Sequence, residues 1–266
     1  MNAIVSHVIT EIDGPIGIVT LNNPEKHNAF DDVLIADLTA TFKALDQNPS
    51  VRVVVLSAVG KSFSAGGDLN WMKRVAGYSQ EENLRDAMAL ATLMRTLHGL
   101  SKPTIARVQG PAYGGGVGLV ACCDMAVGTL NASFSLSEAK IGLIPAVISP
   151  YVIAAIGARA AHRYFLTAER FDAGEALRLG LLNEITPSDD EMDERINDVT
   201  TALMSCSPNA IAEGKLLIAA VAGRSIDDSL MRDTAERIAR VRASEEGREG
   251  LGAFLEKRKA RWIVEV

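Results

Sequence analysis

Two segments of this chain repeat one order of elements, and this repeat constrains the fold more than any other feature. In the first, the apolar run Val51–Ser57 leads through a glycine- and serine-rich loop, Gly60–Asp68, towards a helix. In the second, Thr104–Val108 leads through Gly110–Gly118 into a short apolar helix near Val117–Cys123. Continuous apolar runs rich in β-branched residues are typical of strands buried on both faces of a parallel sheet. Strand, loop and helix in alternation therefore predict an α/β fold.

The elements around these segments fit the same class. A hairpin is expected from His7–Ile12 and Ile16–Leu21, around the turn Asp13-Gly14-Pro15. The next helix should be capped by Asp31 or Asp32 and ended by Asn48-Pro49, with an apolar face of Val33, Leu34, Leu38, Phe42 and Leu45. A longer helix over Gln80–Leu100 should have a face of Leu84, Met88, Ala91, Leu97 and Leu100. A strand near Met125–Val127 should follow the second loop.

The last third of the chain has almost no strand signal. Helices are expected over Pro208–Val221, Asp227–Arg242 and Glu245–Arg261. The sequence therefore predicts two parts, an α/β core domain of residues 1–206 and a helical region of residues 207–266.

Composition narrows the classes of function. The formal net charge is −6, which argues against a nucleic-acid partner. The 3 cysteines, two of them adjacent, fit a reducing compartment better than a disulfide framework, and no Cys/His spacing predicts a metal site. The N-terminus lacks the pattern of a signal peptide, and no run approaches about 18 apolar residues. We therefore expect a cytoplasmic protein without a membrane partner.

The two glycine loops carry the first candidate site. Ligands of open α/β sheets bind at the carboxyl ends of strands, and the loops Ser62–Leu69 and Gly110–Gly118 each follow such an end. If each loop directs one backbone N–H at the same oxygen, the pair forms an oxyanion hole. The alternatives are a strand-to-helix turn capped by Asp68 and tight packing of a short helix on the sheet. A dinucleotide-binding pattern over Gly116–Ala121 is disfavoured, because its helix would be too short for a normal βαβ crossover.

Two charged features add further candidates. Glu138 lies between apolar residues and before a Gly/Pro loop, a setting in which a carboxyl can have a raised pKa and transfer protons. The alternative is a surface glutamate that caps a helix or pairs with Lys140. The terminal segment Phe254–Trp262 carries four positive charges, which suit either a phosphate-rich ligand or, more commonly, a solvated helix face.

Taken in order, four motifs over about Ile16 to Trp262 resemble those of the crotonase (enoyl-CoA hydratase/isomerase) family. Asn22–Phe30 is similar to its NRP…NAL signature, Ser64–Asp68 to its (A/S)AGxD loop and Gly114–Gly116 to its GGG loop. A fourth match is the A-x-x-A…G-L-V segment that begins at Phe171. The resemblance implies an α/β spiral of ββα units with a C-terminal helical region that forms trimers.

The resemblance also implies roles for individual residues. The N–H groups of Gly67 and Gly115 would form the oxyanion hole around a thioester carbonyl, and Glu138 would be the acid–base group. CoA is then part of the substrate, no separate cofactor is needed, and the assembly would be a homotrimer or homohexamer. Phe254 and Lys257 would reach the CoA of a neighbouring subunit. The full set of expected substrate-binding residues is Lys26, Ala29, Ala65, Gly66, Asp68, Leu69, Tyr113, Gly114, Gly118, Pro145, Phe254 and Lys257.

One position departs from the family pattern. Typical hydratases of the family use two glutamates, of which Glu138 aligns with the second; the first belongs to a GGGxE motif, and this chain has Gly118 there. Further motifs, around Asp68–Lys73, Gly115–Asp124 and Ile144–Val152, resemble a bacterial subgroup of methylglutaconyl-CoA and carboxygeranoyl-CoA hydratases, which act in leucine and acyclic terpene catabolism. We expect Gly118 to leave room for a branch at C3 of a 2-enoyl-CoA that the protein hydrates.

The sequence leaves other functions open. An enoyl-CoA isomerase needs a single base, which Glu138 alone can supply. A non-catalytic acyl-CoA-binding protein is also compatible with the missing glutamate. A serine peptidase of the same fold is remote, because no GxSxG motif occurs and no serine or histidine stands out.

Overall fold

The computed structural model describes residues 6–263, which form two compact units. The first holds the chain up to Leu100 and from Thr104 to Asn197, and the second holds Ser101–Pro103 and the chain from Asp198 onward. The first unit is α/β, as predicted, and the second is helical. The domain boundary at residues 206–207 stays a prediction.

A six-stranded sheet forms the centre of the first unit. Its strands follow the order β1 (Val8–Asp13), β2 (Ile16–Leu21), β3 (Val53–Ala58), β5 (Thr104–Val108), β7 (Met125–Thr129) and β10 (Glu184–Thr186). β1 and β2 pair antiparallel with Val8 opposite Leu21, which confirms the hairpin. All other neighbours in this sheet are parallel, as the apolar runs predict.

A second, smaller sheet lies in the segments that the sequence presents as loops. Its order is β4 (Ser64–Ala65), β6 (Ala112–Tyr113), β8 (Ser133–Ser135) and β9 (Arg170–Asp172). The first three strands are parallel, and β9 is antiparallel to β8. Strands of two or three residues carry no readable periodicity, so the sequence does not predict this sheet.

Helices connect the strands of the first unit. They are α1 (Asp32–Gln47), α2 (Leu69–Val75), α3 (Gln80–His98), α4 (Gly115–Cys122), α5 (Ser149–Thr167), α6 (Ala173–Leu179) and the start of α7 (Asp189–Met204), with short 3₁₀ helices η1 (Pro24–Lys26) and η2 (Ser137–Ile141). The Asp31 carboxylate accepts a hydrogen bond of 2.8 Å from the Leu34 N–H, so it caps α1 as predicted. α5 is kinked at Gly157, whose φ is 76°.

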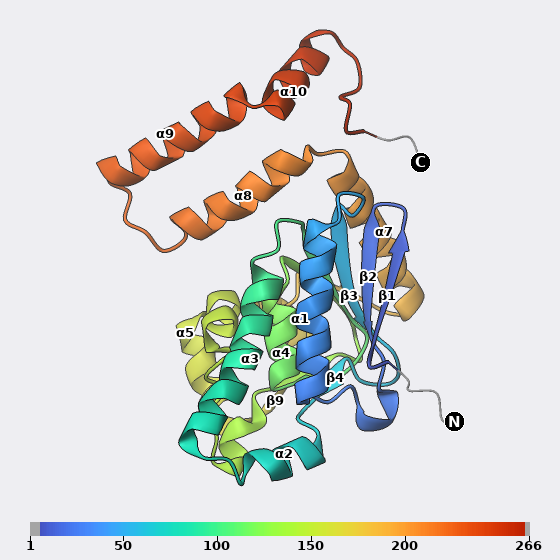
Figure 1. Ribbon diagram of the computed structural model, residues 1–266, viewed down its shortest axis with the longest axis vertical. Helices are drawn as coiled ribbons and strands as arrows, with labels where there is room; N and C mark the ends of the chain where they lie inside the picture. Colours follow the sequence, from blue (N-terminus) through green and yellow to red (C-terminus); the bar gives the residue numbers. More distant parts are fainter. Residues whose placement is uncertain (1–5, 264–266) are drawn as a thin grey trace. The chain divides into compact units, whose positions relative to one another are not determined.

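The second unit contains α8 (Pro208–Val221), α9 (Asp228–Ala243) and α10 (Glu245–Leu255), which pack on one another (Figure 1). α10 is shorter than predicted. Lys257 has a φ of 54°, and this left-handed conformation cannot continue an α-helix.

The core of the first unit is formed by strands of the large sheet, among them β2, β3 and β5, together with α1, α3, α4 and α5, and α1 and α3 pack side by side (Figure 1). Both predicted helix faces are correct in part, with Leu34, Leu38, Phe42, Leu45, Leu97 and Leu100 buried, but three of their residues are exposed. Val33 is 51% exposed at the start of α1, and Leu84 and Met88 are 60% and 56% exposed on α3. Residues 81–85 of α3 are all exposed, so this helix enters the core only through its second half, at Leu93, Met94 and Leu97.

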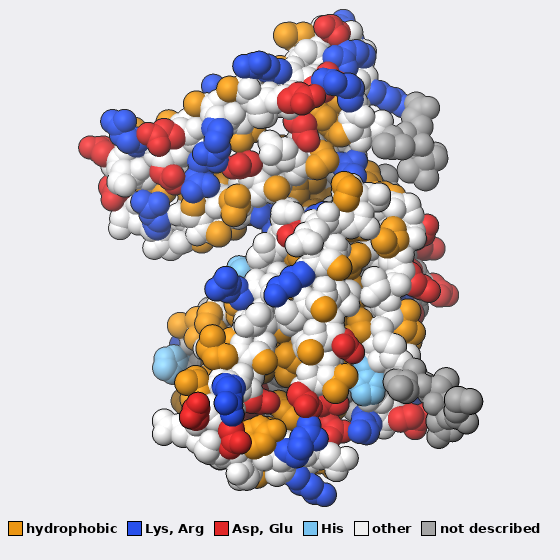
Figure 2. All heavy atoms as spheres, in the orientation of Figure 1, with side chains coloured by type: hydrophobic (Ala, Val, Ile, Leu, Met, Phe, Trp, Pro, Cys, Tyr) orange, Lys and Arg blue, Asp and Glu red, His pale blue; other side chains and the backbone are white. Residues whose placement is uncertain are grey.

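The surface in Figure 2 mixes acidic and basic side chains over each unit, in keeping with the small net charge. Within residues 6–263, every helix is too short or too polar to cross a bilayer.

Candidate active site

Three parallel strands of the smaller sheet end at one edge. Ala65, the last residue of β4, is paired with Tyr113, the last residue of β6. Tyr113 is paired in turn with Ser135, the last residue of β8. Because parallel strands point the same way, the chain leaves this row three times at the same edge of the sheet.

The three residues with an expected catalytic role directly follow this row. Gly67 lies two residues after Ala65, Gly115 two residues after Tyr113, and Glu138 three residues after Ser135. Segments that are more than 70 residues apart in sequence therefore meet at this edge. The structure brings the two glycine loops and the glutamate together, as a shared site requires.

Backbone pairing determines which amides remain free. The Phe30 N–H donates to the Gly66 carbonyl at 3.0 Å, and the Asp68 N–H donates to the Phe30 carbonyl at 2.8 Å. This pattern directs the Gly67 N–H away from Phe30. Gly115 is the first residue of α4, where N–H groups lack a partner within the helix. Neither amide donates a hydrogen bond to any residue between 6 and 263, so both can bind an oxygen atom of a ligand.

Close packing of α4 on β4 explains the GGG motif. A Cβ on Gly116 would lie 2.3 Å from the Ser64 carbonyl oxygen, and no side chain fits there. The packing interpretation of the second loop is therefore correct for Gly116. It is compatible with a ligand-binding role of the loop, because the neighbouring amide of Gly115 remains free.

Glu138 is half-buried in η2 and faces the GGG loop. A Cβ on Gly114, whose φ is 55°, would lie 3.2 Å from Glu138 Oε1. The Oε2 atom is buried and accepts no hydrogen bond within the part of the chain that the structure describes. Burial raises the pKa of this carboxyl above its ordinary value. Among the residues that the structure describes, Glu138 and Lys140 form no ion pair, so the interpretation of Glu138 as a surface residue paired with Lys140 is wrong.

The expectation of free space at Gly118 is also wrong. A Cβ on Gly118 would lie 2.3 Å from Ile148 Cγ2 and 3.2 Å from Met94 Cε. Ile148 is only 3% exposed and occupies the volume that a side chain at position 118 would need. Ile148 and Met94 are neighbours of Gly118 that the sequence does not predict, because they lie 30 and 24 residues from it. Ile148 belongs to the segment Ile144–Val152, but that motif does not indicate what packs on Gly118.

Asp68 and Lys26 form a structural unit beside the first loop. The Asp68 carboxylate accepts hydrogen bonds from the N–H groups of Asn70, at 2.9 Å, and Trp71, at 3.0 Å, so it caps α2. Its other oxygen is 2.7 Å from Lys26 Nζ. The hydrogen bond from Lys26 holds the pKa of Asp68 below its ordinary value. The capping interpretation of Asp68 is therefore confirmed, while its expected contact with substrate remains a prediction.

The other expected substrate-binding residues have varied settings. Ala29 and Pro145 are buried, Ala65 and Gly66 are half-buried, and Leu69 at the start of α2 is exposed. The Tyr113 hydroxyl lies 3.1 Å from Ser133 Oγ. Phe254 and Lys257 belong to the second compact unit, and both are exposed.

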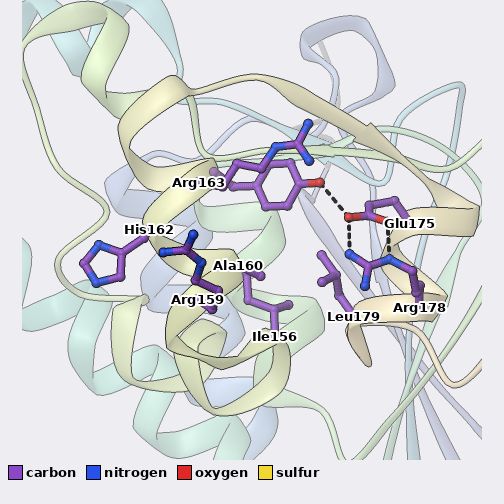
Figure 3. A pocket seen from close by; sticks show the side chains of 9 residues that line it. Ile156, Arg159, Ala160, His162, Arg163, Glu175, Arg178 and Leu179 are labelled. Carbon is purple, nitrogen blue, oxygen red and sulfur yellow. Dashed lines mark hydrogen bonds and ion pairs between the residues drawn. The ribbon is translucent and has the colours of Figure 1, made fainter.

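A separate hollow of about 590 Å³ lies at α5 and α6 and contains none of these residues (Figure 3). Arg178 donates two hydrogen bonds of 2.6 Å to Glu175, which also accepts one of 2.8 Å from the Tyr164 hydroxyl. Arg163 is paired in the same way with Glu169. These ion pairs neutralise two of the cationic groups that line the hollow, and we assign no chemistry to it.

Comparison with known proteins agrees with the site and with the fold. The chain has 46% identity to the crystal structure of an enoyl-CoA hydratase from Shewanella pealeana, covering 97% of this chain and 96% of that one with a TM-score of 0.94. It has 33% identity to Pseudomonas aeruginosa AtuE, covering 97% and 100% with a TM-score of 0.92. It has 29% identity to the crotonyl-CoA hydratase of Syntrophomonas wolfei, covering 97% and 98%.

These structures confirm the expected crotonase fold. The model of the family described as enoyl-CoA hydratase/isomerase matches residues 11–264, nearly the whole chain. The chain therefore belongs to the enoyl-CoA hydratase/isomerase (crotonase) family.

Proposed function

We propose that this enoyl-CoA hydratase adds water across the C2=C3 bond of a 2-enoyl-CoA thioester that carries a branch at C3. The proposal rests on the edge of the smaller sheet, where the free amides of Gly67 and Gly115 and the half-buried carboxyl of Glu138 follow three neighbouring strands. Family membership supports the reaction class, a hydro-lyase acting on a CoA thioester.

In the proposed mechanism the two amides hold the thioester oxygen. Water attacks C3, negative charge develops on that oxygen, and the amides stabilise the enolate-like transition state. One donor of this kind contributes about 10²–10³ in rate. Polarisation of the thioester carbonyl also makes C3 electrophilic. The hydrogen bonds from the two amides therefore both bind the substrate and activate it towards attack by water.

Glu138 performs both proton transfers in this scheme. Its carboxylate takes a proton from the attacking water and then returns one to C2 on the same face. Acid–base catalysis of this kind contributes about 10²–10⁴. A carboxyl whose pKa is raised by burial is a better base when ionised and a better match for neutral pH than an exposed one.

Finer parts of the proposal rest on sequence motifs. The segments around Gly118 and Ile144–Val152 support membership of the methylglutaconyl-CoA and carboxygeranoyl-CoA hydratase subgroup, and with it a role in leucine or terpene catabolism. We also propose a homotrimer or homohexamer in which Phe254 and Lys257 contact a neighbour's CoA. The 81% exposure of Phe254 supports this, because a large apolar side chain so exposed suits an interface.

The second candidate is an enoyl-CoA isomerase, and the single carboxyl favours it. Moving a double bond needs one base that carries a proton between C2 and C4, and no second carboxylate stands at position 118. Separate assays with a 2-enoyl-CoA and a 3-enoyl-CoA distinguish the two. Alcohol product supports hydration, and double-bond migration without alcohol supports isomerisation.

The decisive test is Glu138→Gln, with Glu11→Gln on the exposed face of β1 as the matched control. Hydration of straight-chain and C3-branched 2-enoyl-CoAs is measured together with CoA binding. We expect kcat to fall by about 10²–10⁴ in the Glu138 variant alone, with binding retained. Near wild-type turnover would exclude Glu138 as the base. Binding by the wild type without turnover of any substrate would indicate a non-catalytic acyl-CoA-binding protein.

A further inference from the structure

The volume beside Gly118 is filled by hydrocarbon from two other helices. Ile148 lies at the N-terminus of α5 and Met94 lies within α3. Their atoms Cγ2 and Cε lie 2.3 Å and 3.2 Å from the position of a Cβ on Gly118. Both residues are buried, Met94 completely. The place where other family members have a carboxylate is therefore a packed apolar wall in this chain.

This wall is a neighbour of Glu138 along α4. The Gly118 N–H donates to the Gly114 carbonyl at 3.3 Å, so the two glycines are one helical turn apart, a rise of about 5.4 Å. Glu138 Oε1 faces the Cβ position of Gly114, and Ile148 Cγ2 faces that of Gly118. The chain from Glu138 to Ile148 thus passes along one side of α4. The Glu138 carboxyl lies beside Gly114, and the Ile148 side chain lies beside Gly118.

We infer that Ile148 determines which substituent the site accepts at C3, with a methyl branch resting against its side chain. The inference rests on the proposed function, in which the reacting carbons lie beside Glu138. A substituent that extends from C3 along α4 then meets Ile148 about one turn from the carboxyl.

The chemistry of the wall also selects the kind of branch. Ile148 and Met94 offer no hydrogen bond that could compensate a charged group, and burying an unpaired carboxylate is costly. A substrate with a distal carboxylate would therefore direct its small alkyl branch towards Ile148 and its charged arm elsewhere. The same wall cannot hold a water molecule by hydrogen bonds, which leaves the proton transfers to Glu138.

The test compares Ile148→Val and Ile148→Ala with the same changes at Ile156, a buried isoleucine further along α5. The substrates are 3-methylpent-2-enoyl-CoA and 3-ethylpent-2-enoyl-CoA, because the second must place an ethyl group at the branch. We expect the wild type to prefer the methyl compound in kcat/KM, and Ile148→Ala to reduce this preference by about tenfold or more. Ile148→Val should shift it in the same direction by less, and the Ile156 variants should leave it unchanged.

A binding experiment tests this inference independently of the proposed reaction. Dissociation constants of the saturated 3-methylpentanoyl-CoA and 3-ethylpentanoyl-CoA are measured for the same variants, without any turnover. A shift in their ratio at Ile148 alone supports the inference even if no substrate is hydrated, in which case only the proposed hydration fails. An unchanged ratio in the folded Ile148→Val and Ile148→Ala proteins would overturn the inference, since Ile148 would then only fill the core.

Discussion

Adding a single methyl group at Gly118 tests the packing on which the site depends. In Gly118→Ala the new Cβ would lie 2.3 Å from Ile148 Cγ2 and 2.9 Å from Ile148 Cβ, whereas carbon atoms pack at about 3.5–4.0 Å. Ile148 is 3% exposed and is the N-cap residue of α5, so it has little space into which to move. Overpacking of a tight core costs about 1–3 kcal/mol. The better helix propensity of alanine recovers about 1 kcal/mol.

The expected net effect is a loss of up to about 2 kcal/mol in the free energy of unfolding. The control is the same change in an Ile148→Ala background, where the γ carbons are gone. Ile148→Ala alone should cost about 2–5 kcal/mol. In that background the contact with Ile148 Cγ2 is gone and only the 2.9 Å approach to the Cβ at position 148 remains, so Gly118→Ala should cost less than in the wild type, and the double-mutant cycle should give a coupling of about 1–3 kcal/mol.

Urea unfolding followed by tryptophan fluorescence measures this cycle. The chain has 2 tryptophans, Trp71 in the first unit and Trp262 in the second. A Trp262→Phe background therefore leaves Trp71 to report the unit that contains Gly118. Equal effects of Gly118→Ala in both backgrounds, with unchanged m-values, would refute the contact between Gly118 and Ile148.

Three further predictions concern carboxyl groups. Because burial raises the pKa of Glu138 and the proposed base must be ionised, kcat/KM should fall as the pH decreases through a value above 4.5; a profile that is flat down to pH 4.5 would contradict this. The raised pKa also means that the folded state binds the Glu138 proton more tightly than the unfolded state does. Ionisation of Glu138 therefore destabilises the folded protein as the pH rises. In urea titrations, Glu138→Gln should gain stability relative to the wild type between pH 4 and pH 8. Asp68 has the opposite sign, since Lys26 lowers its pKa: its contribution is present above the unfolded value and is lost as the pH falls through the folded one. Asp68→Ala should therefore cost about 1 kcal/mol at pH 7, Asp68→Asn should cost less because it keeps the cap, and equal losses in thermal unfolding would count against the capping role.

The sequence predicted most of the large sheet because its strands carry strong local signals. The run from Val51 is apolar at almost every position, and only burial on both faces favours such a strand. Helix ends were also readable where a side chain caps them, as Asp31 does for α1. The buried face of α3 was not readable, because Leu84 and Met88 have the same helical spacing as core residues but lie where no other element covers them.

The candidate site was predicted only by its motifs acting together. Taken alone, Glu138 also fits a surface residue, the first glycine loop also fits a turn capped by Asp68, and the second also fits tight packing of a short helix on the sheet. The structure supplies what a single motif lacks, namely the pairing of Ala65 with Tyr113 and of Tyr113 with Ser135. Strands of two residues have no periodicity, so nothing local indicates that these segments are neighbours.

The amino-acid sequence by itself determined the family, the loops that carry the free amides and the loss of a glutamate at position 118. Only the tertiary structure decided what occupies the place of that glutamate. Glycine at position 118 means that no side chain is present there. Whether the volume that a side chain would take stays empty depends on which distant residue packs against the glycine. Ile148 and Met94 fill it because α3, α4 and α5 converge on that point, and such convergence is a property of the folded chain.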